Sequence, residues 1–284
     1  MSCADLISIV ITTYNRSDAL ACVVGALEHQ FDKNFEVIIA DDGSTPSHQA
    51  RIHELQASAS FPLTHVWHPD VGFTAAQARN LGVAASSGSY LILLDGDCVP
   101  EVDFVARHRS LAQKNCFVNG SRVLLSEAFT RKVLSSEATV IDQPWPVWMG
   151  RRVRGESSKL GAKLRLPDFP SRLQRSFKWK AIRSCNMALF KSDYIAVNGF
   201  DETFVGWGHE DADFVLRLHN AGLCRKNGFW STEVYHLWHR ESSRDMENVN
   251  ARLVRERIST KQIRASIGYQ ESLGASEVRV TQQR

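Results

Sequence analysis

Hydrophobic residues follow two alternating patterns through the first hundred residues of the chain. Continuous apolar runs rich in β-branched residues are typical of strands buried on both faces of a parallel sheet, and they occur at residues 6–12, 35–40, 62–68 and 90–94. Apolar residues at helical spacing predict helices between these runs, at residues 17–30, 46–57 and 74–86. The alternation predicts an α/β fold with a Rossmann-like, mostly parallel central sheet flanked by helices.

The second half of the chain is less regular. Residues 125–180 show weak periodicity and several prolines, so we expect a long functional loop or lid there. Further elements are then predicted, namely a strand at 184–190, a short helix to 197, a helix that starts in the acidic motif 206–213, a strand at 231–239 and a helix at 245–267. We expect the tail after Gly274 to fray.

The composition is that of an ordinary globular protein. With 284 residues, of which 43% are hydrophobic and 23% charged, the chain can bury a full core. No run approaches the roughly 20 apolar residues of a membrane-spanning helix, and the first residues lack a secretory signal pattern, so we expect a cytoplasmic protein. The six cysteines form no CxxC pair, which argues against a zinc site and a disulfide scaffold.

Basic residues are concentrated in one segment, although the net charge is only +3. Just downstream of Trp145 and Trp148, two acidic residues stand against eleven basic ones, which are Arg151, Arg152, Arg154, Lys159, Lys163, Arg165, Arg172, Arg175, Lys178, Lys180 and Arg183. Such a segment can rest peripherally on the anionic inner face of a membrane, or it can bind an acidic acceptor. The alternative is a solvated, mobile segment.

Polar side chains follow three of the predicted strands. They are Thr12, Thr13, Tyr14 and Asn15 after the first strand, Asp41 and Asp42 after the second, and Asp95 and Asp97 after the fourth. Ligands of open α/β sheets bind beyond these carboxyl ends. No GxGxxG motif follows the first strand, so the phosphate-binding turn of a nicotinamide-dependent dehydrogenase is missing.

Two pairs of aspartates have the same spacing. Asp95 and Asp97 leave a strand end together, where two carboxylates can hold Mg²⁺ or Mn²⁺ against a diphosphate. Asp211 and Asp213 are predicted to lie on a helix, where they cannot form the same site. The sequence therefore favours the first pair for metal or nucleotide binding.

Five motifs together resemble the inverting glycosyltransferases of family 2, which have the GT-A fold. They are SIVITTYNR, DDGS, GFTAAQARN, LDGD and GFDETFVGWGHED, and the last is similar to the acceptor-side motif of galactosyltransferase-like and chondroitin-polymerase-like enzymes. The resemblance covers roughly residues 6–240. It implies metal-dependent transfer of a hexose-type sugar from a UDP-sugar to a hydroxyl of a glycan or glycolipid, in the synthesis of a polysaccharide or cell-surface glycan.

The resemblance also implies donor contacts. Tyr14 would stack on uracil, Asp42 would accept a hydrogen bond from the ring N–H, and Asp95 would touch the ribose or the metal shell. The other donor-binding residues would be Thr12, Asn15, Arg79 and Asn80. In the alternative interpretation Tyr14 only packs, Asp42 caps a helix and Arg79 is a surface arginine.

A metal ion is implied at Asp97 with His236. A neutral imidazole suits Mn²⁺ better than Mg²⁺, so we expect Mn²⁺ as cofactor, with Mg²⁺ as the alternative. His239 is a rival ligand three residues further on, and either histidine could be structural.

The acidic motif would supply the catalytic base. The resemblance assigns that role to Asp211, which we expect a helix N-terminus to keep ionised. Glu210 would bind acceptor hydroxyls and Trp207 would lie against a sugar ring, while the glycines beside it would let backbone approach the substrate. Asp213 is expected to be structural, and Asn186 to lie near donor or acceptor.

We expect one GT-A domain in four parts. These are a nucleotide-sugar-binding half at 1–124, a variable basic lid at 125–183, an acceptor and catalytic half at 184–244, and a C-terminal helix and tail at 245–284. A non-catalytic subunit that binds the nucleotide sugar is the alternative function. A sugar nucleotidyltransferase would need a glycine-rich, lysine-containing loop after the first strand, which TTYNRSD does not provide.

Overall fold

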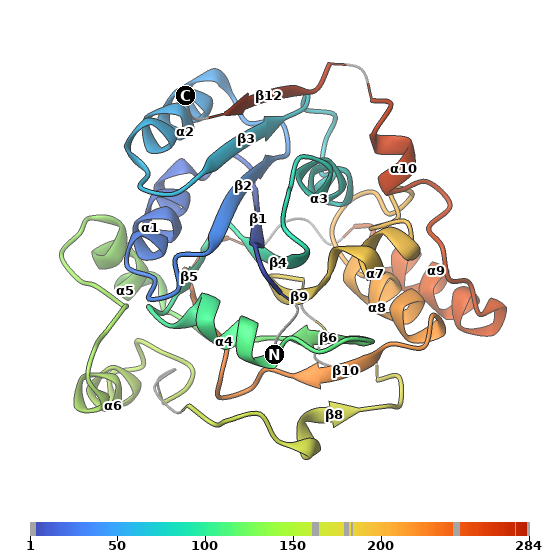
Figure 1. The fold of residues 1–284 in the computed structure, drawn as a ribbon. Helices are drawn as coiled ribbons and strands as arrows, with labels where there is room; N and C mark the ends of the chain where they lie inside the picture. The colour runs from blue at the N-terminus through green and yellow to red at the C-terminus, as the bar shows by residue number, and fades with distance from the viewer. Residues whose placement is uncertain are drawn as a thin grey trace.

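A nine-stranded sheet runs through the molecule in the order β12-β3-β2-β1-β4-β9-β6-β10-β8, with helices on both faces (Figure 1). The structure is a computed structural model, and it describes residues 4–160, 165–178, 182, 184–240, 245–275 and 277–282. A smaller three-stranded sheet consists of β5 (Cys98–Pro100), β11 (Glu233–His236) and β7 (Ser121–Leu124). The α/β fold predicted from the sequence is confirmed.

The N-terminal half of the large sheet is parallel. Its strands are β1 (Ile7–Thr13), β2 (Phe35–Asp41), β3 (Leu63–Trp67) and β4 (Tyr90–Asp95). On one face they pack against α1 (Ser17–Glu28) and α2 (Pro46–Ser58), and on the other against α3 (Ala75–Ala84). Residues of β1 alternate between these two cores, because Ile9 belongs to one and Val10 to the other. Burial on both faces explains why these strands are continuous apolar runs.

Beyond β4 the sheet is mixed. Strand β9 (Asn186–Phe190) is antiparallel both to β4 and to β6 (Cys116–Asn119). Strand β10 (Cys224–Asn227) is parallel to β6 and antiparallel to β8 (Leu173–Gln174). The parallel arrangement that alternation predicts therefore holds for the first hundred residues, where helices connect the strands.

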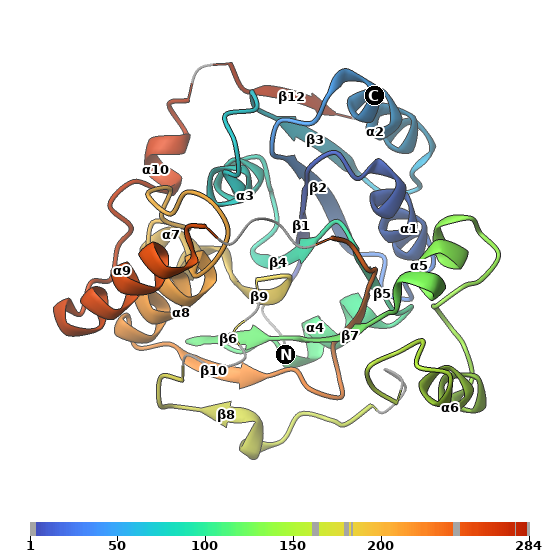
Figure 2. The ribbon, with the colours of Figure 1, turned by 180° about the vertical axis from the view of Figure 1, so that it is seen from behind.

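Further helices follow β4 in the chain. They are α4 (Phe104–Leu111), α7 (Lys191–Ala196), α8 (Glu210–Asn220), α9 (Glu247–Thr260) and α10 (Tyr269–Ser272). The single helix expected at 245–267 is shorter, since α9 ends where Lys261 adopts a left-handed conformation with φ 52°. Helices α8 and α9 lie side by side (Figure 2) and share a small core of Phe204, Ala212, Leu216 and Val254.

The prediction of a long loop at 125–180 is wrong for much of the segment. It contains α5 (Glu127–Leu134), α6 (Trp145–Val153) and the short 3₁₀ helix η1 (Pro170–Arg172). Helix α6 is held by Trp148, whose ring is fully buried and stacks on Tyr235 with 4.4 Å between centroids. Arg151 is also buried, with its guanidinium over the rings of Phe129 and Trp148. Because arginine occupies an inward position, the hydrophobic pattern of this helix was obscured.

Some of the basic residues of this segment bind groups inside the protein. Arg165 binds Asp103 through two hydrogen bonds of 2.6 and 2.8 Å, and Arg172 is buried and donates to four backbone carbonyls. Lys163, Lys180 and Arg183 lie outside the described residues. Arg152, Arg154, Arg175 and Lys178 are exposed, and contact of this segment with a membrane or an acidic acceptor stays a prediction.

The C-terminal tail is ordered as a strand. Strand β12 (Arg279–Gln282) pairs antiparallel with β3 at the edge of the large sheet. Arg279 lies over the ring of Trp67, and Gln56 donates to the carbonyl of Thr281. The expected fraying after Gly274 is therefore wrong, because pairing with β3 satisfies the backbone groups of the tail.

Candidate active site

The polar residues after β1, β2 and β4 meet at one edge of the sheet. Thr12 is paired in register with Asp95, and Thr13 with Asp41. The backbone N–H of Gly96 donates to the carbonyl of Thr12 at 2.8 Å, which fixes the turn between Asp95 and Asp97 against β1. Parallel register thus gathers residues that are far apart in the chain.

Tyr14 presents an exposed ring at this edge. The side chain is 47% exposed, and its hydroxyl donates to Asp70 at 2.9 Å. The next residue, Asn15, has a left-handed conformation with φ 49° and accepts a hydrogen bond from the backbone of Thr45. Gly43, at φ 89°, lets the chain at Asp70 come so close that a side chain there would collide with it.

The two aspartates after β2 have different surroundings. Asp41 is fully buried and binds His65 at 2.9 Å and the backbone N–H of Ser44. Asp42 is nearly buried, and its Oδ1 accepts from the Thr74 hydroxyl at 2.6 Å while its Oδ2 accepts from the Thr74 backbone. Asp42 therefore anchors the start of α3 and leaves acceptor capacity on Oδ2.

Asn80 does not face the donor side. It has no exposed surface, and its amide nitrogen donates to the carbonyl of Phe200 and to Glu202, at 2.9 and 2.8 Å. Its amide oxygen accepts from the Tyr194 hydroxyl and the Phe200 backbone. All four hydrogen-bonding positions of this amide are used inside the protein, so the predicted donor contact is corrected to a structural role.

Arg79 is a buried link and not a surface arginine. It is 4% exposed, its Nη2 lies 3.2 Å from Asp95, and its Nη1 lies 3.4 Å from Glu210. The guanidinium also lies over the ring of Phe200, 5.1 Å from its centroid. The sequence predicted a contact with ribose or diphosphate, whereas the structure gives the cation two protein carboxylates. The Arg79 guanidinium thereby connects the end of β4, at Asp95, to the start of α8, at Glu210.

Asp97 lies against two histidines. Its Oδ1 is 3.6 Å from His236 Nε2, and its Oδ2 is 3.2 Å from His239 Nε2. The small sheet brings the histidines close to Asp97. His236 is in register with Cys98, and the backbone N–H of Leu237 donates to the Asp97 carbonyl at 2.9 Å. Carboxylate and imidazole donors within reach of one another fit Mn²⁺. Both histidines named from the sequence reach the same carboxylate.

Cys98 is a neighbour that sequence reasoning did not include. Its sulfur, a carboxylate oxygen of Asp97 and a ring nitrogen of His236 all lie within 4.8 Å of one another. Burial, with Cys185 beside it, raises the pKa of the Cys98 thiol well above its ordinary value. Without a cation the protonated thiol is favoured, whereas a bound divalent ion would itself lower the pKa of a coordinating thiol.

Asp211 is the residue whose environment differs most from expectation. Burial of its carboxyl group raises its pKa to about 7, and the neighbouring charge of Glu210 adds to the rise. Arg79 and the backbone N–H groups of Ala212 and Ser184 act in the opposite direction. Burial thus acts against the expectation that the helix N-terminus keeps Asp211 ionised, because desolvation favours the neutral carboxyl group. Such a pKa suits a general base near neutral pH.

The loop before α8 holds Trp207 between two glycines. Gly206 and Gly208 have φ of 77° and 108°, and His209 follows at 68°. A side chain at Gly206 would collide with Met246. Gly206 is therefore needed for its conformation and for packing against Met246, whereas a side chain at Gly208 would meet only ordinary contacts, so approach of the backbone to substrate stays a prediction.

Two further candidates are structural. Asp213 has no exposed surface and binds Arg217 at 2.8 Å and Arg257 at 2.7 Å, as expected for a residue outside the site. Asn186 is also fully buried and contacts His108 at 3.1 Å, with its amide nitrogen donating to the Ser121 carbonyl at 3.1 Å. The expectation that Asn186 lies beside donor or acceptor is therefore corrected.

Sequence comparisons identify the family. Residues 8–196 match the model of glycosyl transferase family 2, and residues 169–240 match that of the N-terminal domain of galactosyltransferase. The validoxylamine A glucosyltransferase of Streptomyces hygroscopicus is 29% identical over 77% of this chain and 52% of its own length. The chondroitin synthase of Escherichia coli is 27% identical over 93% of this chain and 39% of its own length. This chain thus spans about half the length of such relatives, or less.

Two solved structures share the fold. Staphylococcus aureus TarS superposes with a TM-score of 0.59 at 12% identity, covering 94% of this chain and 41% of TarS. The mannosyltransferase PcManGT of Pyrobaculum calidifontis, in complex with GDP-Man and Mn²⁺, gives 0.54 at 13% identity and covers 90% of this chain and 62% of its own. In the part of the chain that the structure describes, no helix is both long and apolar enough to span a bilayer. The chain belongs to glycosyl transferase family 2 and has the GT-A fold.

Proposed function

We propose that this protein transfers a sugar from a UDP-sugar to a hydroxyl group of a glycan or glycolipid, with a divalent cation and with inversion at the anomeric carbon. The observation that carries the proposal is the position of Arg79 between Asp95 and Glu210, at 3.2 and 3.4 Å. Asp95 lies two residues from Asp97, and Glu210 precedes Asp211. Candidate donor and acceptor residues are thus held on two sides of one guanidinium.

Asp211 is the proposed base. In a single displacement its carboxylate takes the proton from the acceptor hydroxyl, the oxygen forms a bond to C1 of the donor sugar, and the bond from C1 to the diphosphate oxygen breaks. The electron pair of that bond leaves with UDP. A pKa of about 7 makes Asp211 a stronger base than an ordinary aspartate while a large fraction remains ionised at neutral pH.

The cation would be held by Asp97 and His236, with His239 as the alternative imidazole. A divalent ion there would stabilise the charge that develops on the leaving diphosphate. This chain supplies one carboxylate and two imidazoles, so Mn²⁺ is the preferred ion and Mg²⁺ the weaker alternative.

The nucleoside would lie against the exposed ring of Tyr14. Asp42 Oδ2, which accepts one hydrogen bond in this structure, would accept another from uracil N–H. Thr12 and Asn15 would line the same pocket. Glu210 and Trp207 would contact the acceptor. The nucleoside contacts use side chains at the edge formed by β1, β2 and β4, whereas Glu210 and Trp207 come from the start of α8 and the loop before it.

A donor screen tests the proposal. Purified protein is incubated with Mn²⁺ and each of several UDP-sugars, and with GDP-mannose because PcManGT was solved with that donor. Slow release of UDP from one UDP-sugar, abolished by chelation and by Asp211→Asn, is the expected result. A non-catalytic binding subunit would return every donor unchanged. Release from GDP-mannose alone would overturn the choice of uridine nucleotide.

A further inference from the structure

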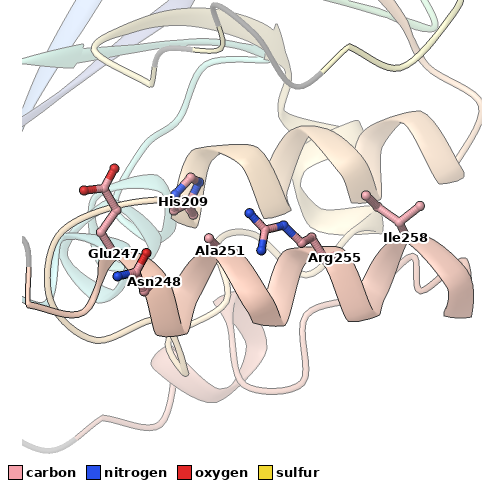
Figure 3. Close-up of a pocket in the computed structure, with 6 residues that line it drawn as sticks. All are labelled: His209, Glu247, Asn248, Ala251, Arg255 and Ile258. Atoms are coloured by element: carbon pink, nitrogen blue, oxygen red, sulfur yellow. The ribbon is translucent and has the colours of Figure 1, made fainter.

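A groove lies along α9, beside the start of α8 (Figure 3). Its lining residues are His209, Glu247, Asn248, Ala251, Arg255 and Ile258. All except His209 belong to α9, and His209 directly precedes Glu210 and Asp211. From Glu247 to Ile258 the groove extends roughly 16 Å at the helical rise, which is longer than one sugar ring.

Helix α9 is fixed firmly to the loop that leads to Asp211. Asn250 is almost fully buried and donates to the carbonyls of Val205 and Gly208, at 3.3 and 3.0 Å. Arg257, on the next turns, lies 2.9 Å from Asp201 and 2.7 Å from Asp213. The wall of the groove therefore keeps its position relative to the proposed base, as a substrate subsite requires.

Charge along the groove is asymmetric. Of the arginines of α9, Arg252 lies 3.8 Å from Glu256 and Arg257 contacts two buried aspartates. Arg255 has no ion pair or hydrogen bond with any residue that the structure describes, and its guanidinium extends back along α9 toward Ala251 (Figure 3). Glu247 is two helical turns away, at the other end. An anionic ligand would therefore place its charge at the Arg255 end.

We propose that this groove is a subsite for the part of the acceptor glycan adjoining the sugar under attack, and that Arg255 binds an acidic group on it. The inference rests on the proposed function. A guanidinium offers paired donors that match a carboxylate or phosphate. The small side chain of Ala251 leaves room for a sugar ring, and Glu247 and Asn248 can hydrogen-bond its hydroxyls.

Calorimetry with matched probes tests this subsite in the presence of UDP and Mn²⁺. One pair is unsulfated chondroitin tetrasaccharide and its carboxyl-reduced form, and the other is a phosphorylated maltotetraose and maltotetraose itself. We expect one acidic probe to bind more tightly than its neutral partner, and Arg255→Ala to weaken that acidic probe about tenfold or more. Whichever pair shows the difference identifies carboxylate or phosphate as the group recognised.

Arg252→Ala is the matched control, because Arg252 is exposed on the same helix and outside the groove. Equal loss in both variants, or no preference of the unmodified protein for either acidic probe, would overturn the subsite. UDP binding and donor hydrolysis are measured on the same samples. If they are intact while the preference is absent, only the subsite fails; if they are absent as well, the proposed function fails.

Discussion

Arg79 Nη1 lies 3.4 Å from Glu210 Oε1, although the two residues are 131 positions apart in the chain. The same guanidinium contacts Asp95 at 3.2 Å. A buried cation that neutralises two carboxylates also lowers the pKa of the nearby Asp211. Arg79 is therefore expected to act on both stability and chemistry without touching either substrate.

Arg79→Gln should cost about 3 kcal/mol of stability or more, because it leaves Asp95 and Glu210 without their shared counter-ion. It should also move the acidic limb of the pH profile of kcat/KM to higher pH, since a charge that lowers the pKa of Asp211 is gone. Thermal unfolding and a pH–rate series measure the two effects. Arg79→Lys should restore part of the profile; an unshifted profile in the Gln variant would mean that Arg79 is only structural.

The rate of transfer should rise with pH through about 7, where Asp211 loses its proton. Glu210 raises that pKa by its negative charge, so Glu210→Gln should shift the acidic limb to lower pH even if the maximal rate falls. A pH series of kcat/KM on both proteins checks this. A profile that stays flat between pH 5 and 8 would argue against Asp211 as the base.

Asp211→Asn should abolish transfer, by about 100-fold or more, and leave UDP binding nearly intact. It should also make the protein more stable at pH 8. The folded pKa of Asp211 is raised from 3.8 to about 7, so the folded protein binds more protons than the unfolded chain in this range and loses stability as pH rises through it. Asp211 is only half-buried, so we expect asparagine to remove a penalty of about 2 kcal/mol. Denaturant unfolding at pH 4 and pH 8 measures the difference, which should appear only at pH 8.

Asp213→Asn, two residues further on, should behave in the opposite way. Asp213 is buried between Arg217 and Arg257, at 2.8 and 2.7 Å, and its loss leaves buried cations unpaired. We expect destabilisation of about 3 kcal/mol or more. Donor turnover per folded molecule should be retained. Comparison of the two variants by unfolding and by activity at low temperature separates the structural carboxylate from the catalytic one.

Removal of the cation should abolish UDP binding, and calorimetry with and without Mn²⁺ measures this. Asp97→Asn should weaken Mn²⁺ binding about 10- to 100-fold. His236→Ala should weaken it more than His239→Ala, because His236 is fixed at the end of β11 whereas His239 is more exposed. The reverse order would make His239 the ligand, and no effect in any variant would remove the metal site from this edge.

Much of the fold followed from periodicity, since the first four strands and three helices agree with their predicted positions. The buried runs of β1, β2 and β4 are long and bounded by polar residues, so their pattern is strong. Helix α6 was missed because its inward residues are Trp148 and Arg151, and a buried arginine over aromatic rings has no hydrophobic signature. The pairing of β12 with β3 depends on contacts between residues more than 200 positions apart, which no local pattern contains.

The sequence predicted which residues gather at the site better than it predicted the role of each. Asp95, Asp97 and the two histidines come together because strand ends meet, which element order alone indicates. Burial of individual side chains could not be foreseen. Asn80 and Arg79 sit on α3 facing the interior, so partners from distant segments decide what they bind. The raised pKa of Asp211 has the same origin, because desolvation is a tertiary property.

The stack of Trp148 on Tyr235 couples α6 to the strand that carries His236. The two side chains are fully buried, and Tyr235 is the immediate neighbour of a proposed ligand. Replacement of Trp148 by a small residue would loosen the end of β11. The affinity of the site for its cation would then fall, although the indole ring contacts no substrate. Screens that score activity alone would then count Trp148 among the catalytic residues.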